Sequence, residues 1–127
     1  MAQVVAPQRL AIVVEDDLDD RHLAAALLEE TDLLVVEADS AEEALHYLRE
    51  NAQKVALVFA DVRLPCIMDG VDLARSISSN WPWIKVILTS GGPAERFDDL
   101  PNAVSYMPKP WRALDVLVEA ERAMQRA

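Results

Sequence analysis

The chain has 127 residues, of which 52% are hydrophobic and 27% charged, and it carries a formal net charge of −10. This length and composition fit a single globular domain over residues 1–127, with an ordered core over about 9–125, and exclude an intrinsically disordered chain. With 12 basic residues against 22 acidic ones and no basic stripe, the chain is not expected to contact nucleic acid directly.

Cysteine usage and hydropathy indicate the compartment. Cys66 is the only cysteine, so no internal disulfide can form, and no zinc-ligand spacing surrounds it. The first residues lack the apolar segment of a signal peptide, and no run of about 18 apolar residues, the length of a membrane-spanning helix, occurs. We therefore expect a cytoplasmic protein without a membrane contact.

The first part of the chain alternates strand and helix patterns. Leu10–Val14 is an apolar run that predicts a strand, and Leu18–Thr31 has the leucine spacing of an amphipathic helix, with Asp19 as its expected N-cap. The β-branched run Leu33–Glu37 predicts a second strand. A Ser-Ala-Glu-Glu capping box then precedes a predicted helix over Ala41–Asn51.

The middle of the chain contains the strand around which the rest is organised. Val55–Asp61 consists of six consecutive apolar residues followed by a carboxylate, a pattern typical of a strand that is covered on both faces. After a loop, Leu73, Ala74 and Ile77 recur at helical spacing and predict the next helix. A fourth strand is expected at Ile84–Ser90.

The last part of the chain gives a weaker signal. Between Gly91 and Asn102 two glycines and two prolines flank a segment with little apolar periodicity, so the fourth helix should be short or irregular. Val104–Met107 predicts a fifth strand, and a closing helix should reach about Met124. The apolar face of that helix is expected to be lined by Trp111, Leu114, Leu117 and Val118.

The alternation of strands and helices predicts the fold class. Strands that alternate with helices form parallel sheets, because each crossover is right-handed and lays its helix over one face. The expected fold is α/β, a doubly wound flavodoxin-like sheet of five parallel strands in the order 2-1-3-4-5. In such a sheet the carboxyl ends of the strands meet at one edge, where binding sites form.

Acidic residues end two of the predicted strands. Glu15 and Asp16 follow the first strand and Asp61 closes the third, and carboxylates are ligands that Mg²⁺ prefers, so these residues predict a divalent cation site. A flavin or nucleotide site is less well supported, because the turn is acidic and the chain has only three glycines. The other acids of this turn are expected only to favour the positive end of the following helix: Asp17, Asp19 and Asp20.

The remaining strand ends supply a hydroxyl group and an amine. Thr89 lies at the end of the fourth strand, and Lys109 follows the fifth strand between two prolines. A cation, an ammonium group and a hydroxyl can each engage one oxygen of a phosphoryl group. A carboxylate can itself be the nucleophile and form an aspartyl phosphate, and Asp61 is the candidate.

These residues resemble the receiver domain of bacterial two-component response regulators (CheY-like) over essentially the whole chain. The resemblance rests on four strand-end signatures in order, with Pro65 and Asp69-Gly70 after the third: Glu15-Asp16, Asp61, Thr89-Ser90 and Lys109-Pro110. It implies a phosphorelay switch that accepts a phosphoryl group from a histidine kinase or a histidine phosphotransfer protein. The output would be a contact with an unknown downstream protein, and the only catalysis would be the chain's own phosphorylation and dephosphorylation.

The resemblance also implies a role for each residue. Lys109 would hold the phosphoryl oxygens, and its bond to Pro110 looks like the cis peptide of the family. Thr89 would move toward the phosphoryl group, and Tyr106 is the aromatic position that turns inward when it does. The phosphoacceptor would be Asp61, and Mg²⁺ would be held by Glu15, Asp16, Asp61 and the backbone carbonyl of Arg63.

The chain departs from the family pattern around the site. The loop after the third strand is one residue longer than the common form, with Cys66-Ile67-Met68 before Asp69. Arg63 and Gly91 occupy positions that, by the resemblance, tune the loss of the phosphoryl group in the family, and we expect Arg63 to lie over the site and influence the entry of water. The weak fourth helix argues against the homodimer that receivers commonly form through that surface.

Two alternatives share the expected fold. A phosphatase that works through an aspartyl phosphate often needs a second carboxylate two residues after the nucleophile, and here that position is Arg63. A nucleotide or flavin binder, or a receiver-like scaffold that no longer accepts phosphate, would show neither covalent transfer nor turnover.

Overall fold

The computed structural model describes residues 9–92 and 100–125. Its strands form one parallel sheet in the order β2-β1-β3-β4-β5, which confirms the predicted fold class and topology. The strands are β1 (Leu10–Val14), β2 (Leu34–Ala38), β3 (Val55–Asp61), β4 (Lys85–Ser90) and β5 (Val104–Pro108). The helices are α1 (Leu18–Glu29), α2 (Ala41–Asn51), the short 3₁₀ helix η1 (Ala52–Lys54), α3 (Gly70–Asn80) and α4 (Ala113–Gln125).

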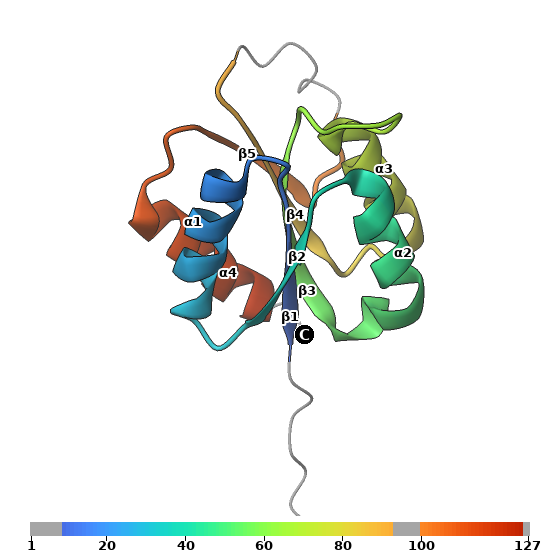
Figure 1. The fold of residues 1–127 in the computed structure, drawn as a ribbon. Helices are drawn as coiled ribbons and strands as arrows, with labels where there is room; N and C mark the ends of the chain where they lie inside the picture. The colour runs from blue at the N-terminus through green and yellow to red at the C-terminus, as the bar shows by residue number, and fades with distance from the viewer. Residues whose placement is uncertain (1–8, 93–99, 126–127) are drawn as a thin grey trace, which may run out of the picture.

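The helices form a layer on each face of the sheet (Figure 1). α1 and α4 cover one face and α2 and α3 the other, as expected when right-handed crossovers carry successive helices over a doubly wound sheet. Each face has its own apolar core. One core is shared by α2, α3 and the sheet, and the other by α1, α4 and the sheet.

β3 is the central strand that its sequence predicts. All seven of its residues are buried, since β1 and β4 flank it and helices cover both of its faces. In the parallel ladder Asp61 is paired with Thr89, so these two side chains lie at the same level of the carboxyl edge. The N–H of Val62 donates to the carbonyl of Thr89 (2.9 Å) and extends the pairing just past the strand.

Two details of the predicted helices are wrong. The N-cap of α1 is Asp17 rather than Asp19, because the helix begins directly at Leu18 and Asp17 accepts a hydrogen bond from the N–H of Asp20. In α4 two residues of the predicted apolar face are exposed, Leu114 by 70% and Val118 by 40%, whereas Trp111 packs against the core. The buried residues of α4 are instead Val116, Ala120 and Ala123.

The predicted weak fourth helix falls mainly on residues 93–99, which lie outside the described residues. The described residues next to them, Gly92 and Leu100, are not helical. In the described part of the chain, no helix has the length and apolar character needed to cross a membrane.

The two ends of the described chain lie together at the amino edge of the sheet (Figure 1). Arg9, just before β1, donates from Nη1 to the carbonyl of Met124 near the end of α4 (2.9 Å). The carboxyl ends of the strands are at the opposite edge of the same sheet.

Candidate functional site

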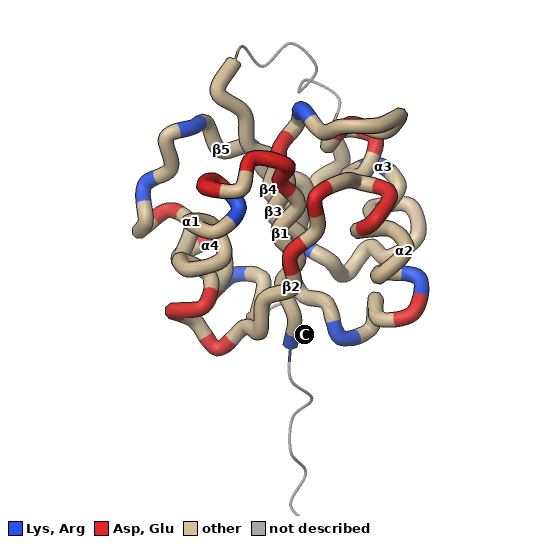
Figure 2. The backbone as a smooth tube through the Cα atoms, in the orientation of Figure 1, with Lys and Arg blue, Asp and Glu red and all other residues tan. Residues whose placement is uncertain are grey.

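Three carboxylates gather at the carboxyl edge of the sheet, where acidic positions of the backbone are concentrated (Figure 2). Glu15 directly follows β1, Asp61 ends β3, and Asp20 lies in the first turn of α1. The Glu15 and Asp61 side chains are only 4% and 11% exposed, whereas that of Asp20 is 40% exposed. The site therefore has a buried pair of acids and a third acid at its solvent side.

The backbone fixes each buried carboxylate through one of its two oxygens. Glu15 Oε1 accepts a hydrogen bond from the N–H of Asp17 (3.1 Å), and Asp61 Oδ1 accepts one from the N–H of Arg63 (2.9 Å). Arg21 Nη1 donates to the main-chain carbonyl of Glu15 (3.1 Å). The other oxygen of each carboxylate remains directed into the site.

Lys109 lies among the carboxylate oxygens that are directed into the site. Its Nζ donates to Asp61 Oδ2 (2.7 Å), to Glu15 Oε2 (3.0 Å) and to Asp20 Oδ2 (3.0 Å). The Lys109 N–H donates to the carbonyl of Ser90 (3.0 Å), which holds the segment after β5 beside β4. The bond from Lys109 to Pro110 is cis, as expected.

Three carboxylates with one ammonium group make an electrostatically unbalanced site. Burial and the neighbouring carboxylate of Asp61 raise the pKa of Glu15 to about 7, although the hydrogen bonds from Asp17 and Lys109 oppose this. Burial lowers the pKa of Lys109, but its hydrogen bonds to Asp61, Asp20 and Glu15 outweigh that effect and raise it above the ordinary value. Lys109 therefore stays charged, and the site as a whole favours an added positive charge.

Thr89 is hydrogen-bonded through its side chain to Trp111. Its side chain is buried, with the residue 1% exposed, and its Oγ1 accepts a short hydrogen bond from the indole Nε1 of Trp111. The Trp111 ring packs edge-on against Phe59 in the middle of β3, with ring centroids 5.1 Å apart. Lys109 Nζ lies 5.7 Å from the centroid of the same ring.

The other residues with predicted roles surround the site. Tyr106 is half-buried, and its hydroxyl donates to the carbonyl of Ser90 (3.3 Å). Arg63 is exposed and reaches across to the end of β4, where its Nη2 lies 3.1 Å from the position that a Cβ on Gly92 would occupy. Gly91 is exposed, and an added Cβ there would meet nothing within 4 Å.

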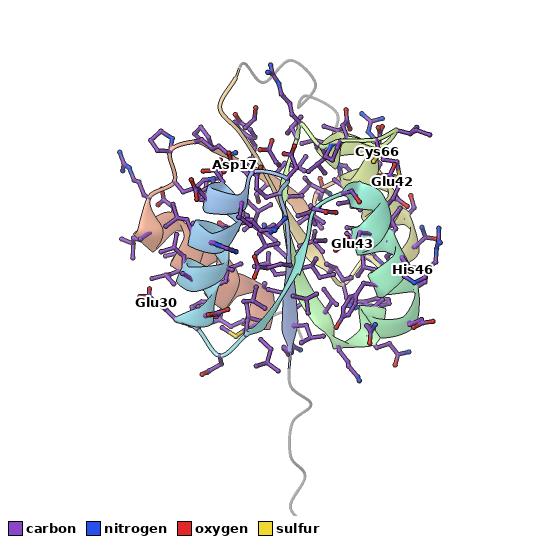
Figure 3. All side chains as sticks on the ribbon, in the orientation of Figure 1. Asp17, Glu30, Glu42, Glu43, His46 and Cys66 are labelled. Carbon is purple, nitrogen blue, oxygen red and sulfur yellow. The ribbon has the colours of Figure 1, made fainter. Side chains whose placement is uncertain are left out.

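The loop after Asp61 is anchored at both ends. A Cβ on Gly70 would lie 2.2 Å from the carbonyl oxygen of Asp61, so only glycine allows α3 to begin this close to the end of β3. In the middle of the loop Cys66 adopts a positive φ of 74°. The N–H groups of Ile67 and Met68 donate to Glu42 Oε2 at the start of α2 (3.2 and 3.0 Å), and Figure 3 shows Glu42 and Cys66 on the same side of the molecule.

Comparison with known proteins shows the family of the chain. Residues 11–120 match the response regulator receiver domain family. The chain belongs to this family. It is therefore a signalling domain of two-component systems, with the arrangement of strands and helices shared by that family.

This receiver domain matches part of a longer relative. The transcriptional regulatory protein PdtaR of Mycobacterium tuberculosis (strain H37Rv) is 32% identical over 128 aligned residues. The alignment covers 98% of this chain but only 60% of PdtaR, so the chain spans about three fifths of the length of the curated relatives it matches.

Solved structures show the same arrangement. The receiver domain of NtrX from Brucella abortus is 26% identical, with a TM-score of 0.74 over 92% of this chain and 99% of that one. A response regulator receiver protein from Sinorhizobium medicae has a TM-score of 0.84, covering 94% of this chain and 98% of that one. At 19% identity, the latter likeness concerns the fold alone.

The donor set of this receiver domain fits a small divalent cation. Glu15 and Asp61 offer buried carboxylate oxygens whose mutual repulsion an added cation would relieve, and Mg²⁺ typically takes one or two carboxylates and keeps several waters. Among residues 9–92 and 100–125, no three or more acidic, histidine or cysteine side chains surround a common metal position. The carboxylates surround Lys109 Nζ instead. Asp16 is exposed next to Glu15, and its role as a ligand stays a prediction.

Sequence reasoning missed two residues of the receiver site. Asp20 was expected only to favour the start of α1, yet it contacts Lys109 directly. Trp111 was assigned to an apolar helix face, yet it precedes α4 and its N–H holds Thr89. A signal for Trp111 is present in the sequence, because it directly follows the Lys109-Pro110 motif. No local signal identifies Asp20, whose partner lies 89 residues further along the chain.

Proposed function

We propose that the chain is a phosphoacceptor switch in which Asp61 accepts a phosphoryl group from a histidine kinase or a histidine phosphotransfer protein. The observation that supports this most directly is the position of Asp61 Oδ2, 2.7 Å from Lys109 Nζ beside the buried carboxylate of Glu15. A structural ion pair needs only one carboxylate for one lysine. The excess of acids is better explained by a site that binds a further positively charged group.

The proposed step is an in-line displacement at phosphorus. A carboxylate oxygen of Asp61 forms the new O–P bond while the P–N bond to the donor imidazole breaks, and the imidazole nitrogen retains the bonding pair and takes up a proton. The hydrogen bond from the N–H of Arg63 fixes Asp61 Oδ1, which orients the carboxylate. Lys109 Nζ is positioned to neutralise the oxygens of the arriving group.

Mg²⁺ would be held by Glu15, Asp16, Asp61 and the backbone carbonyl of Arg63. When bound it supplies charge neutralisation for the phosphoryl oxygens. Lys109 and Thr89 supply the remaining contacts from the other strand ends. The output of the switch is proposed to be a change in a surface that another protein recognises, because the acidic chain offers no basic stripe for nucleic acid.

Incubation with a small phosphodonor such as acetyl phosphate and Mg²⁺ tests the proposal. The expected product is a protein with the added mass of one phosphoryl group, measured by intact mass spectrometry. Asp61→Asn should abolish the gain, and Asp19→Asn, which changes an exposed acid of the same region, should not. A gain that persists in Asp61→Asn would overturn the assignment of the phosphoacceptor.

The phosphatase alternative predicts a different outcome. It requires continuous turnover of the donor, and the residue two positions after Asp61 is Arg63, which offers no carboxylate as a general acid. We propose that Arg63 instead limits water entry, since its guanidinium reaches across the loops to Gly92. Arg63→Ala should change the lifetime of the phosphoryl group, and equal lifetimes in variant and parent would contradict this role.

A further inference from the structure

The side chain of Trp111 connects the inside of the site with the surface. Its indole N–H donates to the hydroxyl oxygen of Thr89, which is 1% exposed, and its ring packs against Phe59 and near Lys109. Trp111 also lines a surface cavity of about 300 Å³ together with Asp20, Leu23, Lys109 and Pro110. One side chain thus contacts the Thr89 hydroxyl and borders open space beside α1.

The hydrogen bond from Trp111 restricts the orientation of the Thr89 side chain. An indole N–H can only donate, so the Thr89 oxygen must be the acceptor in this hydrogen bond. The bond holds the Thr89 side chain in the rotamer that faces Trp111. Asp61 is the register partner of Thr89 on the neighbouring strand, so both side chains project from the same face of the sheet.

We propose that Trp111 is a positioning residue that holds Thr89 in the unphosphorylated state and releases it when the phosphoryl group arrives. This inference rests on the proposed phosphoacceptor function of Asp61. Once Thr89 turns to donate its hydroxyl proton to a phosphoryl oxygen, the Trp111 N–H loses its acceptor. Because an unpaired N–H is costly when buried, the ring then turns toward the adjoining cavity, where water can accept from it.

The hydrogen bond opposes phosphoryl binding by the free energy needed to break it. Removing the N–H while keeping an aromatic ring, as in Trp111→Phe, should therefore increase the affinity for the phosphoryl analogue beryllofluoride, added with Mg²⁺, by about fivefold. Trp83 provides a matched control. Its Nε1 also donates to a protein oxygen, the carbonyl of Ala52 (3.1 Å), but it precedes β4 at the opposite edge of the sheet.

The affinity test compares five proteins: the parent, Trp111→Phe, Trp83→Phe, Thr89→Val and the double variant of Thr89 and Trp111. Trp111→Phe should bind beryllofluoride more tightly than the parent, and Trp83→Phe should bind like the parent. In a Thr89→Val background, Trp111→Phe should have no further effect, because the acceptor is already absent. Equal or weaker affinity in Trp111→Phe would overturn the proposal.

A second measurement uses the parent protein and does not depend on how the Trp111 variant folds. The chain has three tryptophans, so its ¹⁵N-labelled form gives three indole N–H resonances, which Trp81→Phe and Trp83→Phe assign by elimination. On addition of beryllofluoride and Mg²⁺ the Trp111 resonance should shift and exchange faster with water, while that of Trp83 stays in place. An unmoved Trp111 resonance, with binding that still depends on Asp61, would overturn this inference alone. Absence of any binding that depends on Asp61 would overturn the proposed function as well.

Discussion

Replacement of Lys109 by methionine tests the electrostatic description of the site most directly. Lys109→Met keeps an unbranched side chain of similar length and removes the ammonium group that contacts all three carboxylates. Breaking a buried ion pair by removing one partner typically costs 3–5 kcal/mol, because the other charge is left uncompensated. Since Lys109 is 20% exposed and Asp20 is 40% exposed, we expect a loss near the lower end, about 3 kcal/mol at about pH 8.

The size of this loss should depend on pH. In the parent the raised pKa of Glu15, about 7 against an ordinary value of 4.5, means that the folded state binds more protons than the unfolded state between these values. The contribution of Glu15 to stability therefore falls as pH rises through that window. Without Lys109 the pKa of Glu15 should rise further. The stability that Lys109→Met loses relative to the parent should therefore be larger at about pH 8 than at about pH 5.5. The difference between the two pH values should be about 1.4 kcal/mol for each unit by which the pKa of Glu15 rises.

Equilibrium urea unfolding in the presence of a chelator, at both pH values, measures the two deficits. The melting temperature should fall by about 10 °C at the higher pH. Asp61→Asn is the companion variant, because it removes one of two mutually repelling carboxylates, and it should remain within about 1 kcal/mol of the parent. A Lys109→Met protein that matches the stability of the parent at high pH, or shows the same deficit at both pH values, would refute the reasoning.

Three further outcomes are expected. Asp20→Asn frees the lysine of one carboxylate and should accelerate phosphorylation by an anionic donor about threefold, whereas Asp19→Asn leaves the rate unchanged. Gly70→Ala forces a Cβ against backbone atoms and should cost about 3 kcal/mol in urea unfolding; a Gly91→Ala protein, which gains no close contact, should keep the parent value. Because Glu15 takes up a proton near pH 7, calorimetry should find that the affinity for Mg²⁺ is about tenfold weaker at about pH 6 than at about pH 8. Equal affinities at the two pH values would exclude Glu15 as a ligand.

The sequence predicts the fold well where a single pattern is decisive. Val55–Asp61 could be assigned as the central strand with its observed bounds, since a continuous apolar run of that length is typical of burial on both faces. The capping pattern placed the start of α2 correctly, and Ser40 accepts from the N–H of Glu43 (3.1 Å). Both features are determined by neighbouring residues alone.

Features that depend on distant partners could not be predicted in the same way. The closing helix has two overlapping apolar faces, and periodicity favoured the face with Leu114 and Val118, whereas the structure buries Val116 and Ala120. The contact of Asp20 with Lys109 depends on how far the first turn of α1 leans over the edge of the sheet. Such orientations are set by the assembled core, not by local sequence.

The pairing of Arg9 with the end of α4 fixes where attached segments can emerge. Anything joined before β1 or after α4 starts from the side of the molecule that faces away from Asp61, separated from it by the length of the strands, about 20 Å. A fluorescent label attached directly at Arg9 or Gln125 would therefore lie at the edge opposite the acceptor. It would also detect an event at Asp61 only through movements relayed along the packed helices.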